Sequence, residues 1–138
     1  MEFTLLMDRI KWWLNTALQV LTAAPALHSL IIRQREDAAD ILEYLFPIHV
    51  NLRKLILEYC YLGQDSTGLL ANVMALYPDL EGLSLEGCYP LTSAGYGHIV
   101  HLKKLSELNL SYSQVDYIYI KPVETHDLHI WTHVGEHP

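Results

Sequence analysis

Apolar and polar residues alternate in a pattern that occurs twice along the chain, at 52–60 and at 80–88. Both segments read leucine, two residues, leucine, one residue, leucine, two residues, cysteine, and they start 28 residues apart. Similar segments at 27–35 and 105–113 have arginine and serine at the cysteine position, so successive starts are 25, 28 and 25 residues apart. This spacing predicts four copies of one structural unit, each beginning with a short strand.

Between these segments the apolar period changes from 2 to 3.6, which predicts helices. The segments 36–46 and 65–77 each carry an apolar face and stop at a proline, and the second has Asp65 or Ser66 as its N-cap. The segment 92–101 contains two glycines, each costing about 1 kcal/mol relative to alanine, so we expect a short or frayed helix there.

Strand, loop and helix therefore alternate, which predicts an α/β fold built as a solenoid of about four repeats. Stacked units place the strands in a parallel inner sheet and the helices outside, with the leucines of both filling the space between them.

Three regions follow from these patterns. Residues 1–26 are predicted to form a helix that caps or precedes the repeats, because their apolar residues recur at spacings of three and four. Four charged residues interrupt that stretch, which argues against a membrane span or a signal peptide. Residues 27–114 hold the repeats, and 115–138 are expected to form an edge strand (115–120) and an irregular histidine-rich tail.

Composition narrows the range of possible functions. A length of 138 residues favours one domain, and a formal charge of −7 disfavours nucleic acid, whose binding needs clustered Lys and Arg. Cys60 and Cys88 share one repeat position and are predicted to be reduced, partly buried thiols bonded weakly to loop backbone. This cysteine use favours a reducing compartment, cytoplasmic or nuclear. We find no grouping of side chains typical of catalysis, and we expect neither enzymatic activity nor a cofactor.

The segment 83–95 resembles the cysteine-containing subclass of leucine-rich repeats, in which leucine-threonine-aspartate and a glycine follow the cysteine. Here Ser93 replaces the aspartate, and Tyr96 replaces the leucine after the glycine. The resemblance covers about 27–115 and implies the solenoid fold.

The same subclass is common in the substrate-binding parts of F-box adaptors of ubiquitin ligases and in ribonuclease-inhibitor-like proteins. The resemblance therefore implies a protein-binding module related to ligase substrate receptors. One helix before the first repeat leaves no F-box-like segment, and neither end shows a polar cap. We therefore expect a fragment or isoform of a longer array.

Residues that alternate with the leucines should point away from the helices, toward the face that binds partners in this architecture. Acidic residues and tyrosines on that face favour a protein partner with a basic patch. The predicted partner-binding residues are Ile31, Arg33, Lys54, Ile56, Glu58, Tyr59, Ser84, Glu86, Glu107, Asn109 and Tyr112.

The alternative function is zinc binding by the tail, because four closely spaced imidazoles can supply a tetrahedral site. The histidines concerned are His126, His129, His133 and His137. A surface or structureless tail explains the same residues without a metal.

Overall fold

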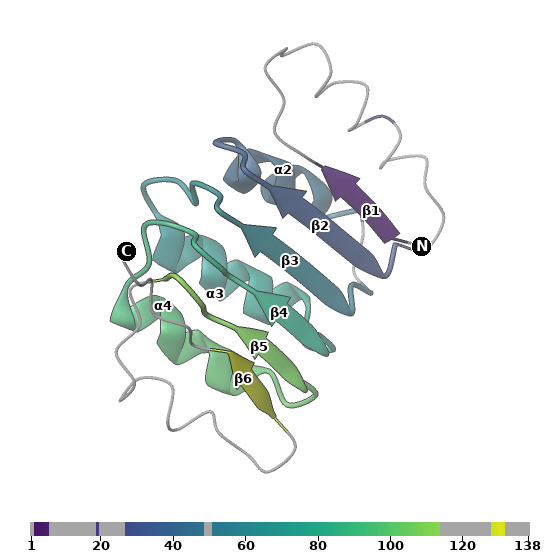
Figure 1. Cartoon of the computed structure of the whole chain (residues 1–138). Coiled ribbons are helices and arrows are strands. Elements are labelled where there is room, and N and C mark those ends of the chain that lie inside the picture. Colours follow the sequence, from purple (N-terminus) through teal and green to yellow (C-terminus); the bar gives the residue numbers. More distant parts are fainter. Residues whose placement is uncertain (1, 6–18, 20–26, 49–50, 114–127, 132–138) are drawn as a thin grey trace.

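Six short strands lie side by side in the order in which the chain makes them, all parallel, in a single sheet (Figure 1). The computed structural model describes residues 2–5, 19, 27–48, 51–113 and 128–131. The strands are β1 (Glu2–Leu5), β2 (Ser29–Arg33), β3 (Lys54–Glu58), β4 (Gly82–Ser84), β5 (Glu107–Asn109) and β6 (His129–Trp131). The predicted α/β class and parallel sheet are therefore confirmed.

The sequence repeats stand in phase across the sheet. Ser29 on β2 pairs with Lys54, which pairs with Gly82, which pairs with Glu107, so the pairing steps equal the sequence steps of 25, 28 and 25 residues. Ile31, Ile56, Ser84 and Asn109 form the second set of partners. Each of these two sets forms a column of partners across the sheet, and both columns agree with the predicted register. Because side chains alternate along a strand, a common register puts each column on one face of the sheet.

The helices follow the strands and cover one face of the sheet (Figure 1). Their bounds are α2 (Ala38–Leu45), α3 (Ser66–Leu76), α4 (Ser93–Gly97) and the 3-10 turn η1 (His98–His101). Asp65 caps α3 by accepting a hydrogen bond from the Gly68 amide at 3.0 Å. Thr92 caps α4 in the same way through the Gly95 amide. The segment with two glycines makes a short helix, as predicted. This helix then tightens into the 3-10 turn η1.

The core lies between the sheet and the helices. Leu30, Leu55, Leu83 and Leu108, equivalent leucines of the four repeats, are at most 3% exposed. The apolar face of α2 joins the same core through Ile41, Leu42 and Leu45. The opposite face of the sheet, which we call the open face, carries the residues that alternate with these leucines.

Two predictions about the ends of the chain are wrong where the structure describes them. Residues 2–5 form β1, which pairs with β2, rather than the start of a helix. Residues 129–131 form β6 beside β5, in a region expected to be irregular. In both cases an adjacent strand supplies backbone partners, and such pairing outweighs local helical periodicity or the absence of a repeat pattern. The rest of the predicted 1–26 helix and the strand at 115–120 lie outside the described residues.

Candidate interaction surface

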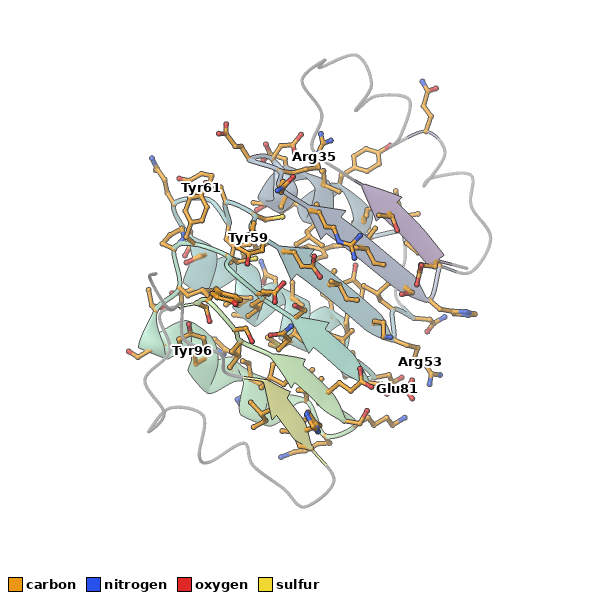
Figure 2. The ribbon with its side chains drawn as sticks, viewed as in Figure 1. Arg35, Arg53, Tyr59, Tyr61, Glu81 and Tyr96 are labelled. Carbon is orange, nitrogen blue, oxygen red and sulfur yellow. The ribbon has the colours of Figure 1, made fainter. Side chains whose placement is uncertain are left out.

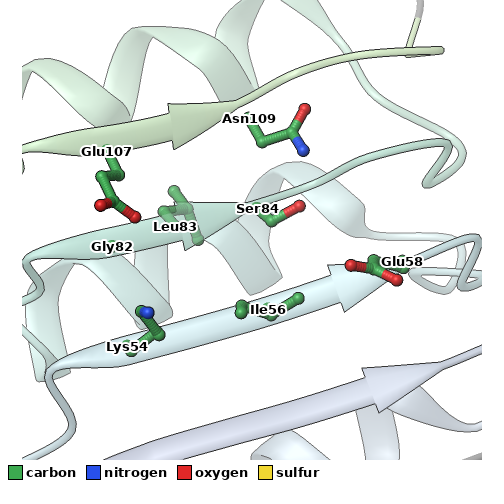
Figure 3. Close-up of a pocket in the computed structure, with 8 residues that line it drawn as sticks. All are labelled: Lys54, Ile56, Glu58, Gly82, Leu83, Ser84, Glu107 and Asn109. Atoms are coloured by element: carbon green, nitrogen blue, oxygen red, sulfur yellow. The ribbon is translucent and has the colours of Figure 1, made fainter. Parts of the chain in front are cut away.

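A shallow pocket of about 190 Å³ lies on the open face (Figure 3). Six of the predicted partner-binding residues contribute to it, together with two residues of β4 that were not predicted. Its lining is Lys54, Ile56, Glu58, Gly82, Leu83, Ser84, Glu107 and Asn109. Small-molecule pockets usually enclose about 300–1,000 Å³, so this one suits a single side chain better than a whole ligand of that kind.

The pocket exists because β4 contributes small residues between strands that contribute long ones. Gly82 forms its floor, and a Cβ there would stand 3.3 Å from Cε of Lys54, whose side chain lies against the glycine. Ser84, 6% exposed, continues the floor. Lys54 and Glu107 stand on either side of Gly82 (Figure 3). The role of Gly82 could have been inferred from the sequence, since it is the smallest member of its column.

Two hydrogen bonds hold side chains of the open face in place. The Arg33 guanidinium donates to the Glu58 carboxylate at 2.8 Å, which connects β2 to β3. The Asn109 side-chain oxygen accepts from the Ser111 amide at 3.0 Å, which fixes the orientation of this side chain at the edge of the pocket. Ile31, predicted as part of the surface, is 8% exposed and offers little area to a partner.

Four equivalent residues just beyond the strands have left-handed backbone conformations. These are Gln34, Tyr59, Gly87 and Tyr112, with φ of 54°, 53°, 63° and 57°. The amides of Gln34, Tyr59 and Gly87 donate to the carbonyl oxygens of Glu58, Glu86 and Ser111 on the next unit, so backbone hydrogen bonding continues past the strands. Tyr59 and Tyr112 stand at this turn, just past β3 and β5, and both are exposed. Glycine adopts positive φ without strain, whereas a bulky residue does so at a cost.

Tyr59 and Tyr112 belong to units separated by one strand, yet their ring centroids are 6.4 Å apart. They approach each other because the intervening unit has Gly87, and a Cβ there would stand only 2.4 Å from the Tyr59 ring. Both rings remain about half exposed, at 46% and 45%. Partial burial, with Glu86, Tyr112 and Glu58 nearby, raises the pKa of Tyr59. We call Tyr59, Gly87 and Tyr112 the tyrosine ledge.

A second aromatic pair was missed in the sequence. Tyr61 and Tyr89 are joined by an isolated parallel bridge, and their ring centroids are 5.6 Å apart. Each follows the repeat cysteine by one residue, so extending the repeat pattern by one position would have found them. Figure 2 shows Tyr59 and Tyr61 toward the carboxyl ends of the strands, away from Arg53 and Glu81 at the amino ends.

The two cysteines are reduced and buried, at 0% and 4% exposure. The Cys60 thiol donates to the carbonyl oxygen of Ile32 at 3.3 Å, and that of Cys88 to the carbonyl oxygen of Leu57 at 3.2 Å. These acceptors belong to strands rather than to loops, and burial is complete rather than partial, which corrects both details of the prediction. The neighbouring Cys60 thiol, together with burial, raises the pKa of Cys88.

Of the four tail histidines, His129 is described; it lies on β6, beside Glu107. His126, His133 and His137 lie outside the described residues, so the zinc prediction is not tested. Within the part of the chain that the structure describes, no three His, Cys, Asp or Glu side chains are grouped as metal ligands would be.

Comparisons with known proteins give no identity. No family model matches the chain, and neither curated proteins nor solved structures show a significant match. Among the described residues, every helix falls short of the length and apolar character that crossing a bilayer requires.

Proposed function

We propose that this chain is a leucine-rich repeat module that binds a protein partner, without catalysis, through its open face. The observation that carries the proposal is that the pocket over Gly82 adjoins the tyrosine ledge, since Glu58 lines the pocket and immediately precedes Tyr59. A pocket of about 190 Å³ is suited to one side chain of a partner. Exposed tyrosines are typical of protein interfaces, since each offers a wide apolar body and a hydroxyl.

The repeat class is supported by three kinds of equivalence between units. Strand pairing follows the sequence repeat at every step from β2 to β5. The two cysteines donate to the preceding strand in the same way. The residue before each cysteine position has a left-handed conformation in all four units. A solenoid of stacked identical units would show each of these features.

We infer that the partner presents a basic patch. Glu58, Glu86 and Glu107 line or border the open face, and the chain carries a formal charge of −7. Complementary charge mainly raises the association rate and the specificity of such contacts. A relationship to ubiquitin-ligase substrate receptors is a further part of this proposal, and it rests on the resemblance of 83–95.

Affinity capture from cell lysate, with quantitative mass spectrometry, tests the function. The wild-type chain is compared with a face variant, E58Q/E86Q/Y59A, and with a matched control on the outer surface of α2, D40N/E43Q/Y44A. Both variants lose two negative charges and one exposed tyrosine. Asp40, Glu43 and Tyr44 are all exposed.

We expect a protein that the wild type and the control retain and that the face variant loses at least about tenfold. Ligase subunits among such proteins would support the receptor relationship. Identical retention by all three chains, with circular dichroism showing that all are folded, would contradict binding through the open face.

A further inference from the structure

The tyrosine ledge has acidic neighbours. Glu58 and Glu86 occupy equivalent positions on adjacent units, immediately before Tyr59 and Gly87. The Tyr59 amide donates to the Glu86 carbonyl oxygen at 2.8 Å, and partial burial together with the nearby Glu86 and Glu58 carboxylates raises the pKa of the Tyr59 phenol. Aromatic faces and carboxylates are thus combined at the carboxyl ends of β3 and β4.

The structure already contains one guanidinium at this end of the sheet. Arg33 donates to Glu58 at 2.8 Å from the neighbouring unit. One unit further along, Glu86 occupies the place of Glu58, and no cationic side chain among the described residues lies within 4.0 Å of it. On the unit before Glu86, the position equivalent to Arg33 is occupied by Glu58, whose carboxylate cannot donate a hydrogen bond. A cation for Glu86 must therefore come from outside the described part of the chain.

Arginine suits the ledge better than lysine does. Its planar guanidinium stacks on aromatic faces while its edge donates to a carboxylate, whereas an ammonium group acts as a compact, strongly hydrated charge. The Tyr59 and Tyr112 rings are tilted by 33° at 6.4 Å, and each is about half exposed, so their outer faces can receive a flat group. Cation–π contact requires the cation within about 6 Å of a ring centroid.

We propose that the tyrosine ledge, with Glu86, binds an arginine side chain of the protein partner. The guanidinium lies over the rings of Tyr59 and Tyr112 and donates to the Glu86 carboxylate. This inference rests on the proposed binding function of the open face and specifies the chemistry of one contact within it.

NMR with ring-labelled tyrosine tests the contact. The probes are a short Gly/Ser peptide carrying two arginines, the same peptide with lysines, and the same peptide with neutral citrullines. Signals of Tyr59 and Tyr112 are assigned from the variants Tyr59→Asn and Tyr112→Asn. Asparagine lacks an aromatic face but adopts positive φ more readily than tyrosine, so these variants should keep the turn.

We expect the arginine peptide to shift the Tyr59 and Tyr112 signals and to bind more tightly than the lysine peptide, with the citrulline peptide weakest. Tyr59→Asn should weaken arginine binding about threefold to tenfold, and Tyr59→Phe should retain it within about twofold. Glu86→Gln should reduce the preference for arginine over citrulline. The control Tyr44→Asn, on α2, should leave binding unchanged.

Equal affinity for the three peptides, or arginine binding unaffected by Tyr59→Asn and Tyr112→Asn, would overturn the arginine contact. Such a result is distinct from failure of the proposed function. The open face would still be a binding surface if the face variant lost the captured partner while the peptides did not discriminate.

Discussion

Arg35 donates two hydrogen bonds of 2.8 Å to the carboxylate of Asp37, from Nε to one oxygen and from a terminal nitrogen to the other. The Arg35 side chain is 4% exposed, and that of Asp37 is 30% exposed. Arg35 occupies the repeat position that Cys60 and Cys88 hold in the next two units. Those thiols donate to backbone carbonyl oxygens, whereas the first unit has the Arg35–Asp37 ion pair at the start of α2.

Removing the Asp37 charge should destabilise the fold. Asp37→Asn removes the carboxylate charge that the buried Arg35 guanidinium contacts, and breaking a buried pair costs several kcal/mol. Because Asp37 is partly exposed, we expect a smaller loss, about 1–3 kcal/mol, measured by urea unfolding. The control is Asp79→Asn, which breaks the exposed Lys104–Asp79 pair and should cost under about 1 kcal/mol. Equal losses in both variants would show that burial of Arg35 contributes nothing.

Two glycines should respond to alanine in opposite ways. Gly87→Ala introduces a Cβ 2.4 Å from the Tyr59 ring at a φ of 63°, so we expect destabilisation of about 1–3 kcal/mol and displacement of the ring. Gly97→Ala adds a Cβ with nothing within 4 Å, at a helical φ of −59°, and should stabilise by up to about 1 kcal/mol. Thermal unfolding of both variants measures the contrast, and a stabilising Gly87→Ala would refute the packing described for the tyrosine ledge.

Both thiols should resist modification in the native state. Cys60 and Cys88 are buried and donate to backbone carbonyls, so a thiol reagent such as Ellman's reagent reaches them only after local or global opening. We expect two thiols to react rapidly in denaturant and at least about 100-fold more slowly without it. Comparison of Cys60→Ser with Cys88→Ser separates the two sites. Rapid native reaction of either would contradict its burial.

The Tyr77 phenol should give a pH-dependent contribution to stability. Burial raises its pKa from 10.0 to about 12, and its ring packs edge-on against Phe46 with centroids 5.9 Å apart. The unfolded chain therefore loses this proton from about pH 10, and the folded chain only near pH 12. Stability contributed by the neutral phenol is complete below pH 10 and falls as pH rises through this window.

Tyr77→Phe keeps the ring packing and removes the ionisable group. We expect the variant to lose less stability than the wild type between pH 9 and 11. Chemical denaturation of both proteins at each pH measures this difference. Spectrophotometric titration should also lack one of the late tyrosine ionisations. Identical pH dependence of the two proteins would mean that Tyr77 ionises as readily in the fold as in the unfolded chain.

Local sequence determined the repeating elements because their signals are short-range. Alternating leucines, proline stops and the Asp65 and Thr92 caps act within a few residues, and the helices begin and end where these signals place them. The register of the columns followed too, since the leucine pattern shared by the repeats leaves one pairing that keeps every leucine on the buried face.

Only the tertiary structure decided how neighbouring units contact one another. The strand at 129–131 exists beside Glu107–Asn109, which supplies its backbone partners, and no periodicity in the tail predicts it. Likewise, Gly87 becomes a gap between two tyrosines because Tyr59 and Tyr112, on the units before and after it, carry large rings. Such features depend on pairs of residues at least 22 positions apart, whose contact is created by stacking and is invisible in any local window.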